Sequence, residues 1–157
     1  MKKLDNKTIV LGIGNNGRQD DGLGWLFLDF LKSEYTDFDL EYRYQLQIED
    51  AELISNYQNV IFIDASKDES EDGFSYYPCK PSEKYSFSTH ALDPETILYL
   101  SEKLYNHEPE ATILAIQGYD WELKIGLSEK GTQNLNSAKQ YFKESMLNKH
   151  HSINKYY

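Results

Sequence analysis

The chain has 157 residues, with 16 lysines and arginines against 26 aspartates and glutamates. Its formal net charge of −10 at pH 7 argues against a nucleic-acid partner, because neutralising phosphates requires a basic face. Hydrophobic residues make up 39% of the chain, so at this length we expect a single domain that buries its own core. Cys79 is the only cysteine, which excludes an intramolecular disulfide framework and fits a reducing compartment.

The first half of the chain alternates between strand and helix patterns. Residues 8–13 form an aliphatic run typical of a strand buried on both faces, and glycines follow it. Apolar residues then fall at helical spacing over residues 22–34. Residues 38–46 alternate between apolar and polar, which predicts a half-exposed strand. Residues 51–54 suggest a short helix, and residues 59–65 form a second fully buried strand.

The second half continues this alternation. A polar and acidic loop is expected at residues 66–73, followed by a strand at residues 74–79. A capped helix is expected over residues 93–104, because an acid, a proline and a second acid open it. Residues 111–116 predict a third buried strand, and an apolar stripe over residues 135–146 predicts the last helix.

The order of these elements predicts an α/β fold, with a single domain built on a twisted, mostly parallel five-stranded sheet and helices on both faces. The domain is expected to span residues 1–149 and to be followed by a frayed tail at residues 150–157. The longest uninterrupted apolar runs are about four residues, far short of the roughly 18 that a membrane-spanning helix needs. We therefore expect no membrane insertion and a monomeric, cytoplasmic protein.

Ligands bind at the carboxyl ends of the strands in sheets of this kind. That rule selects the loop at residues 14–21 after the first strand, Asp64 at the end of the second buried strand, and residues 118–121 after the third. A carboxylate placed directly after an apolar run, as Asp64 is, is poorly placed for solvent. It therefore requires hydrogen-bond donors or a cation as a partner.

The loop after the first strand contains a G-x-G-x-x-G motif made by Gly12, Gly14 and Gly17. In dinucleotide-binding proteins this motif lets the backbone approach a pyrophosphate. Here Asp20 and Asp21 would stand before the helix start, where two carboxylates repel a pyrophosphate. No acid follows at the end of the next strand, where the ribose would be bound. A dinucleotide-binding domain remains the less favoured alternative.

Asp20 and Asp21 are adjacent, but we expect them to differ in role. Helix capping explains Asp20 as well as any function does, and on that interpretation Asp20→Ala costs about 1 kcal/mol and leaves activity largely intact. Asp21 and Asp64, with His90 in the loop ahead of a capped helix, make a set of two carboxylates and one imidazole. Such a set suits a borderline divalent ion with open coordination positions. Asp21→Ala is therefore expected to abolish activity without unfolding the protein.

Four segments of the chain carry a resemblance to a known family. They read LGIGNNGRQDDGLG at residues 11–24, IFIDA at residues 61–65, STH at residues 88–90 and AIQGYDWELKIGLSE at residues 115–129. In this order and spacing they resemble the [NiFe]-hydrogenase maturation endopeptidases. The resemblance extends over residues 9–142, so residues 1–149 are expected to be a hydrogenase maturation protease-like domain.

The resemblance implies an aspartic-type or metal-recognising endopeptidase, which removes the C-terminal extension of a [NiFe]-hydrogenase large subunit after nickel has been inserted. Asp21, Asp64 and His90 match the family's catalytic and metal-binding triad by position. The implied metal is nickel held by the substrate's own cysteines, with another divalent ion as a substitute in the isolated protein, and the implied partner is the large-subunit precursor. The sequence has no Gly-x-Ser-x-Gly elbow and no histidine near Cys79, which agrees with a protease that uses no serine or cysteine nucleophile.

The chain departs from the family pattern in two places. Gly17 stands where a large aliphatic residue is common, and residues 45–49 read Gln-Leu-Gln-Ile-Glu where many members have a Gly-Gly-Thr turn. The second departure leaves the identity of the substrate hydrogenase open, because that turn is expected near the cleft. A non-cleaving, nickel-dependent maturation protein is a further alternative, which a cleavage assay separates from the protease.

Overall fold

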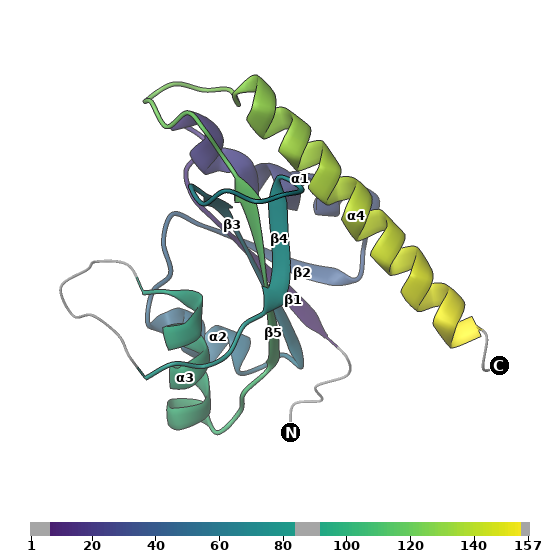
Figure 1. Cartoon of the computed structure of the whole chain (residues 1–157). Helices are drawn as coiled ribbons and strands as arrows, with labels where there is room; N and C mark the ends of the chain where they lie inside the picture. The colour runs from purple at the N-terminus through teal and green to yellow at the C-terminus, as the bar shows by residue number, and fades with distance from the viewer. Residues whose placement is uncertain (1–6, 84–91, 155–157) are drawn as a thin grey trace.

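Five strands form one sheet in the order β2-β1-β3-β5-β4 (Figure 1). The computed structural model describes residues 7–83 and 92–154, and its elements are β1 (Thr8–Ile13), the 3-10 turn η1 (Gln19–Gly22), α1 (Leu23–Glu34), β2 (Phe38–Arg43), α2 (Glu49–Ile54), β3 (Asn59–Ser66), β4 (Phe74–Pro78), α3 (Pro94–Tyr105), β5 (Glu110–Gln117) and α4 (Glu129–Asn154). β1 pairs in parallel with β2 and β3, and β3 pairs in parallel with β5. β4 runs antiparallel to β5 at one edge. The predicted α/β class with a mostly parallel five-stranded sheet is confirmed.

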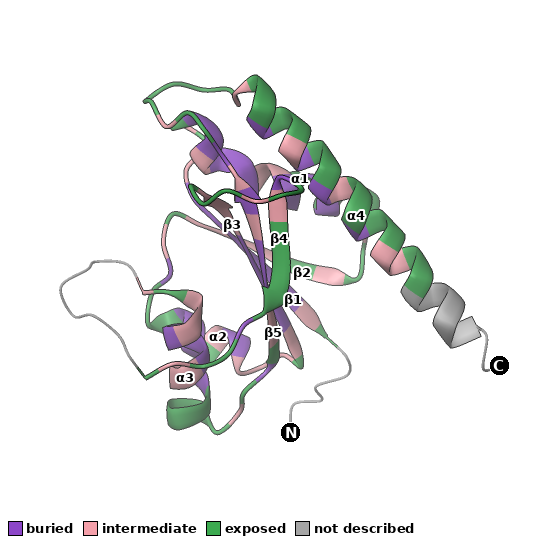
Figure 2. Cartoon of the chain, viewed as in Figure 1, coloured by how far each residue is buried: buried purple, intermediate pink, exposed green. Residues whose placement is uncertain are grey.

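Helices cover both faces of the sheet because successive side chains of a buried strand point to opposite sides. Val10 belongs to the core that α1 and α4 cover, whereas Ile9 and Leu11 belong to the core under α2 and α3. Figure 2 shows the buried residues along the strands and on the inward sides of these helices. On the first face, Phe27 of α1 and Phe142 of α4 meet edge to face, with ring centroids 5.7 Å apart.

The second strand is shorter than the alternating pattern predicts. β2 ends at Arg43 and not at Leu46, and the carbonyl of Arg43 makes the last contacts there, accepting hydrogen bonds from the backbone N–H of Gly14 at 2.9 Å and from Trp25 Nε1 at 3.0 Å. The chain then leaves the sheet, and Leu46 forms an isolated antiparallel bridge with Leu92. The buried side chain of Leu46 joins the core under α2 and α3.

The last helix is longer than its apolar stripe predicts. α4 begins at Glu129, where the Ser128 side chain accepts a hydrogen bond from the backbone N–H of Gly131 at 3.0 Å. Within residues 129–148, for which burial is described, the buried residues of the helix are Gly131, Leu135, Ala138 and Phe142, and the apolar pattern marks the last three of these. The helical backbone continues to Asn154, within the segment expected to fray, and residues 155–157 lie outside the described residues. The fraying of residues 150–157 stays a prediction.

The helix at residues 93–104 is confirmed as α3, which begins where the sequence predicts. Asp93 caps it by accepting a hydrogen bond from the backbone N–H of Thr96 at 2.8 Å, and Pro94 occupies the first turn.

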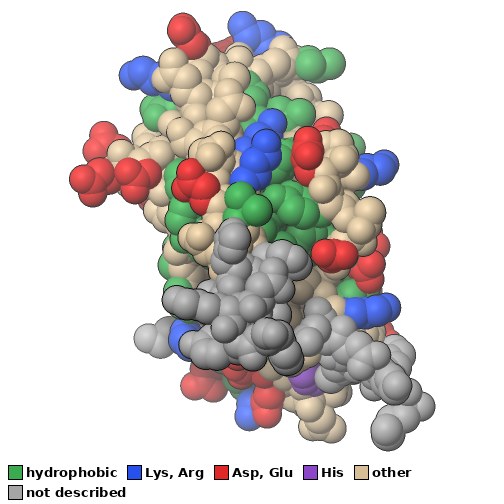
Figure 3. All heavy atoms as spheres, turned by 90° about the vertical axis from the view of Figure 1, so that its right-hand side faces the viewer, with side chains coloured by type: hydrophobic (Ala, Val, Ile, Leu, Met, Phe, Trp, Pro, Cys, Tyr) green, Lys and Arg blue, Asp and Glu red, His purple; other side chains and the backbone are tan. Residues whose placement is uncertain are grey.

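The surface mixes charges of both signs. On the described part of the face in Figure 3, lysines and arginines are scattered among acidic side chains, and hydrophobic side chains gather near the middle. None of the helices within residues 7–83 and 92–154 combines the length and the apolar character that crossing a membrane would require.

Candidate functional site

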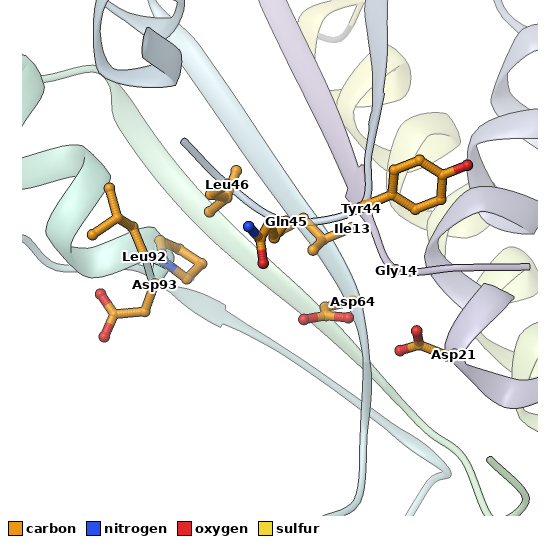
Figure 4. A pocket seen from close by; sticks show the side chains of 10 residues that line it. Ile13, Gly14, Asp21, Tyr44, Gln45, Leu46, Asp64, Leu92 and Asp93 are labelled. Atoms are coloured by element: carbon orange, nitrogen blue, oxygen red, sulfur yellow. The ribbon is translucent and has the colours of Figure 1, made fainter. Parts of the chain in front are cut away.

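A pocket of about 370 Å³ opens at the carboxyl ends of β1 and β3 (Figure 4). The parallel register places Asp64 of β3 beside Ile13 of β1 on one side and Ala115 of β5 on the other. The pocket is lined by residues from five segments: Ile13, Gly14, Asp21, Tyr44, Gln45, Leu46, Asp64, Leu92, Asp93 and Pro94. The pocket therefore lies where the strand-end rule predicts a ligand site.

Asp64 is half-buried at the floor of this pocket, at the end of the apolar run that precedes it. Burial raises the pKa of Asp64 to about 7, because it disfavours the charged carboxylate. The backbone N–H of Ala65 lowers the pKa in part, and the negative charge of Asp21 raises it further. Near neutral pH, Asp64 therefore exists as a mixture of carboxylic acid and carboxylate.

Asp21 reaches the same pocket from η1, the turn that follows β1. Its backbone N–H donates to the carbonyl of Arg18 at 3.1 Å, and its own carbonyl accepts from the N–H of Asn15 at 3.0 Å. Burial raises the pKa of Asp21, while the positive charges of Arg18 and Lys67 and the hydrogen bond with Asn15 counter part of that rise. The structure thus brings Asp21 and Asp64 together, and Figure 4 shows their carboxylates beside each other.

His90, the third predicted site residue, lies outside the described residues. Leu92, Asp93 and Pro94, which follow it shortly in the chain, all line the pocket. Within the described ranges, no group of three or more histidine, cysteine, aspartate or glutamate side chains is arranged to hold a metal ion. Asp21 and Asp64 alone can offer two oxygen ligands, so further ligands have to come from His90 or from a substrate.

The glycines of the G-x-G-x-x-G motif are explained by contacts within the chain. Gly14 has a φ of +142°, and a Cβ built on it would lie 2.0 Å from the backbone carbonyl oxygen of Asp21. The turn carrying Asp21 therefore occupies the space beside Gly14 into which a pyrophosphate would have to fit. α1 begins only at Leu23, after the two aspartates, so its N-terminus does not adjoin the glycines as it does in a dinucleotide site. This geometry disfavours the dinucleotide alternative.

Asp20 does not cap a helix, and the capping interpretation of this residue is wrong. No side-chain hydrogen bond caps η1 or α1, and Asp20 is 0% exposed. Its carboxylate accepts four hydrogen bonds from the loop between β5 and α4: from the N–H groups of Tyr119 at 2.7 Å and Asp120 at 3.1 Å, and from the N–H and Oγ of Ser128 at 2.8 and 2.6 Å. The buried carboxylate of Asp20 thus joins η1 to the loop between β5 and α4, two segments that are far apart in the chain.

The environment of Asp20 stabilises its ionised form. Burial alone would raise the pKa of Asp20, but the hydrogen bonds from Ser128, Tyr119 and Asp120 lower it below the usual value. The packing leaves no spare volume, since a Cβ on Gly131 would lie 2.7 Å from Asp20 Oδ1. Asp20 is therefore an ionised anchor, whereas its neighbour Asp21 faces the pocket.

The turn after β2 forms one wall of the pocket. From the sequence, this turn was expected only to lie near the cleft. Tyr44, Gln45 and Leu46 line the pocket. The turn is fixed by the buried carboxylate of Asp50, which accepts from Arg43 Nε at 3.1 Å and from the backbone N–H of Gln47 at 2.9 Å. The alternating pattern continues through Gln45 and Leu46, so it gave no local signal that the strand ends before them.

The single cysteine does not line this pocket and is not poised to act as a nucleophile. Cys79 is buried in the core under α2 and α3, and burial raises the pKa of its thiol to about 12. At neutral pH the thiol is protonated and unreactive. This agrees with the expectation that no cysteine nucleophile acts here.

The sequence matches no protein-family model and no curated protein. Several solved structures nevertheless share the fold. A hydrogenase 2 maturation peptidase from a Thaumarchaeota archaeon is 20% identical with a TM-score of 0.64, over 89% of this chain and 97% of that one. The [NiFe] hydrogenase maturation protease HycI of Thermococcus kodakarensis is 20% identical with a TM-score of 0.67, over 88% and 91%. The hydrogenase maturating endopeptidase HybD of E. coli is 18% identical with a TM-score of 0.60, over 88% and 93%. The chain thus has the fold of these proteins over nearly its whole length.

Proposed function

We propose that this chain is a hydrogenase maturation endopeptidase, which cleaves the C-terminal extension from the large-subunit precursor of a [NiFe] hydrogenase. The observation that carries the proposal is the meeting of Asp21 and Asp64 in one pocket at the carboxyl edge of the sheet. The shared fold of the maturation proteases from three organisms supports it. So does the motif resemblance, which selects the same two carboxylates.

The nickel in this proposal belongs to the substrate. Two carboxylates and His90 would give at most three ligands, which leaves coordination positions for the thiolates of a nickel-loaded precursor. Asp21 is placed to approach such an ion because it lines the pocket, where burial raises its pKa and the charges of Arg18 and Lys67 counter part of that rise. Recognition of the loaded precursor would then require no resident metal, although another divalent ion could occupy the carboxylates in the isolated protein.

Asp64 is suited to proton transfer. Peptide hydrolysis requires a group that takes a proton from the attacking water and returns one to the leaving amine. A carboxyl group with a pKa of about 7 can do both near neutral pH. In this proposal Asp21 contacts the substrate-borne nickel, and Asp64 exchanges the proton while it is not itself a ligand of that ion, because a metal-bound carboxylate is held deprotonated.

The single thiol and the net charge of the chain bear on the compartment and the oligomeric state of the proposed enzyme. A single buried thiol is compatible with a reducing compartment, and a net charge of −10 disfavours self-association through electrostatic repulsion. We infer a monomeric enzyme that acts in the cytoplasm.

Cleavage of the precursor by purified protein tests the proposal. Nickel-loaded precursor should be shortened at its C-terminus and nickel-free precursor should not, as measured by mass spectrometry. Asp21→Asn, Asp64→Asn and His90→Ala should each abolish cleavage, whereas the matched surface variant Glu102→Gln should retain it, since the Glu102 side chain lies in an exposed ion pair with Lys103. Binding of loaded precursor without any cleavage by the wild type would instead identify a non-cleaving maturation protein. Absence of both binding and cleavage would refute the proposal.

A further inference from the structure

The loop between β5 and α4 exposes two large apolar side chains. In this loop, residues 118–128, Leu123 is 78% exposed and Ile125 is 89% exposed, which are the highest values among the large hydrophobic residues that the structure describes. Figure 1 shows the loop at the top of the molecule, at the start of α4, and Figure 2 shows that much of it is exposed. Exposed apolar side chains held close together commonly mark sites of protein interaction.

The loop is fixed in place although its tip is exposed. The backbone N–H of Gln19 donates to the carbonyl of Lys124 at 2.9 Å, and Gln19 Oε1 accepts from the N–H of Glu122 at 3.1 Å. These contacts flank Leu123, and the four hydrogen bonds to Asp20 hold the two ends of the loop. A surface held in one conformation loses little entropy when a partner binds, so it favours recognition over non-specific contact.

The loop is continuous with the pocket through η1. Gln19 and Asp20, which bind the loop, directly precede Asp21 in the same turn. Lys67 Nζ lies 5.3 Å from the ring centroid of Trp121 in the loop, and the charge of the same lysine acts on Asp21. A molecule that covers the loop therefore lies beside the pocket.

The size of the pocket indicates that a protein substrate needs such an additional surface. About 370 Å³ accommodates a group the size of a small ligand. Specific protein complexes instead bury roughly 800 Å² on each partner. A folded precursor must therefore be bound mainly outside the pocket.

We propose that the loop at residues 118–128 is a docking element for the protein substrate, and that Leu123 and Ile125 bind an apolar patch of the folded large-subunit precursor beside its C-terminal extension. This inference rests on the proposed function. The precursor is favoured over a second copy of this chain as the occupant, because the loop adjoins the pocket and two copies that each carry −10 repel one another.

Steady-state processing of the nickel-loaded precursor tests the docking element. The variant Leu123→Ser/Ile125→Ser is compared with the wild type and with the control Leu104→Ser. Leu104 is also exposed, at 54%, but it lies in α3 at the other end of the molecule (Figure 1). We expect the double variant to raise KM at least tenfold, as the loss of a central apolar contact does in protein interfaces, and the control to keep the wild-type KM. Thermal unfolding should match for all three proteins, because each substituted side chain is exposed.

The outcomes separate the docking inference from the proposed function. If the wild type cleaves the precursor and the double variant has an unchanged KM, the loop does not dock the substrate, although the protease assignment stands. If sedimentation shows that the wild type associates with itself and that the double variant does not, with equal KM values, the loop is a self-association surface and the inference is wrong. If the wild type neither binds nor cleaves the precursor, the proposed function fails and the docking inference fails with it.

Discussion

The carboxylates of Asp20 and Asp64 are both withdrawn from solvent, yet their pKa values move in opposite directions. Around Asp20, four hydrogen bonds outweigh the effect of burial and favour the charged form. Around Asp64, burial dominates over the single amide of Ala65, and the charge of Asp21 adds to the rise. More donors at Asp64 would stabilise the fold but would lower the pKa, and so would make Asp64 a poorer proton acceptor.

Replacing Asp64 with asparagine should stabilise the protein while abolishing processing. The folded-state pKa of about 7 lies above the unfolded value of 3.8, so the unfolded wild type loses its proton first and the wild type loses stability as the pH rises from about 4 to 7. Asp64→Asn has no such loss. Its advantage in free energy of unfolding should grow over this range, to no more than about 4 kcal/mol, and then stay constant. Urea denaturation at a series of pH values measures the difference, and a constant difference across the range would show that Asp64 is not protonated in the folded state.

Replacing Asp20 should have the opposite pH dependence. The pKa of Asp20 is lowered in the folded state, so its contribution is present above the unfolded value of 3.8 and is lost as the pH falls through the folded value. Asp20→Asn should cost about 3 kcal/mol at neutral pH, because several buried hydrogen bonds to a charge are lost, and less below pH 4. The same denaturation series checks this. A cost of about 1 kcal/mol at all pH values would instead show that the hydrogen bonds to the Asp20 carboxylate contribute little to stability.

The sequence predicted Asp64 and could not predict the role of Asp20, for a physical reason. Asp64 directly follows an apolar strand, so its burial can be inferred from its immediate neighbours. The partners of Asp20 are Tyr119, Asp120 and Ser128, about a hundred positions further along the chain. No local pattern records such a contact, and an acid before a helix is usually a cap.

Among the elements, the turn after β2 depends on an ion pair for its position. Arg43 Nε and Asp50 Oδ1 are 3.1 Å apart, and only 4% of the Asp50 side chain is exposed. The same arginine lies where β2 leaves the sheet, so the pair sets the position of Gln45 and Leu46 in the pocket wall. The alternating pattern predicted a longer strand because it records which side chains face the core, and not where the hydrogen-bonded ladder ends.

Removing the charge of Arg43 alone should lower the stability of the protein, and removing the charge of Asp50 as well should recover part of the loss. Arg43→Met should lower the free energy of unfolding by about 3 kcal/mol, because it leaves the buried carboxylate of Asp50 without its cation. The double variant Arg43→Met/Asp50→Asn should lose less free energy of unfolding than the two single variants lose in sum. The difference should be about 1 kcal/mol or more, as is usual for residues in contact. A double-mutant cycle by chemical denaturation provides the comparison. Strict additivity would mean that the pair contributes nothing.

For the whole molecule, alternating strand and helix patterns were sufficient to predict the fold class, because buried parallel strands and their covering helices have distinct periodicities. The bounds of α4 were not predictable in the same way. Its first turn is set by the hydrogen bond to Ser128, and residues 147–154 contain few apolar residues, so the apolar stripe in the sequence marks neither end of the helix. The convergence of Asp21 and Asp64 followed from topology, whereas the pocket wall from the turn after β2 required the structure.

The isolated protein should bind free divalent ions weakly. Two carboxylates and His90 are too few ligands for a closed site, and tight binding would not be needed if the nickel arrives with the precursor. Calorimetric titration with Ni²⁺ at neutral pH should show no tight, stoichiometric site. A zinc ion that remains at one per chain after chelator treatment would indicate a conventional metalloprotease and would exclude recognition through substrate-borne nickel.

The Asp20 anchor also sets an order of events during folding. It joins positions 99 to 108 residues apart in the chain, so the turn that carries Asp21 cannot take its final form until the polypeptide as far as Ser128 has been made and the loop has closed. β1, α1, β2 and β3 can begin to assemble earlier through the contacts that they make with one another, although β3 is completed only by pairing with β5 and α1 only by packing against α4. The pocket that Asp21 lines should therefore form after the first strands of the sheet, so that a nascent chain, or one truncated before Ser128, is folded in part but lacks the proposed activity.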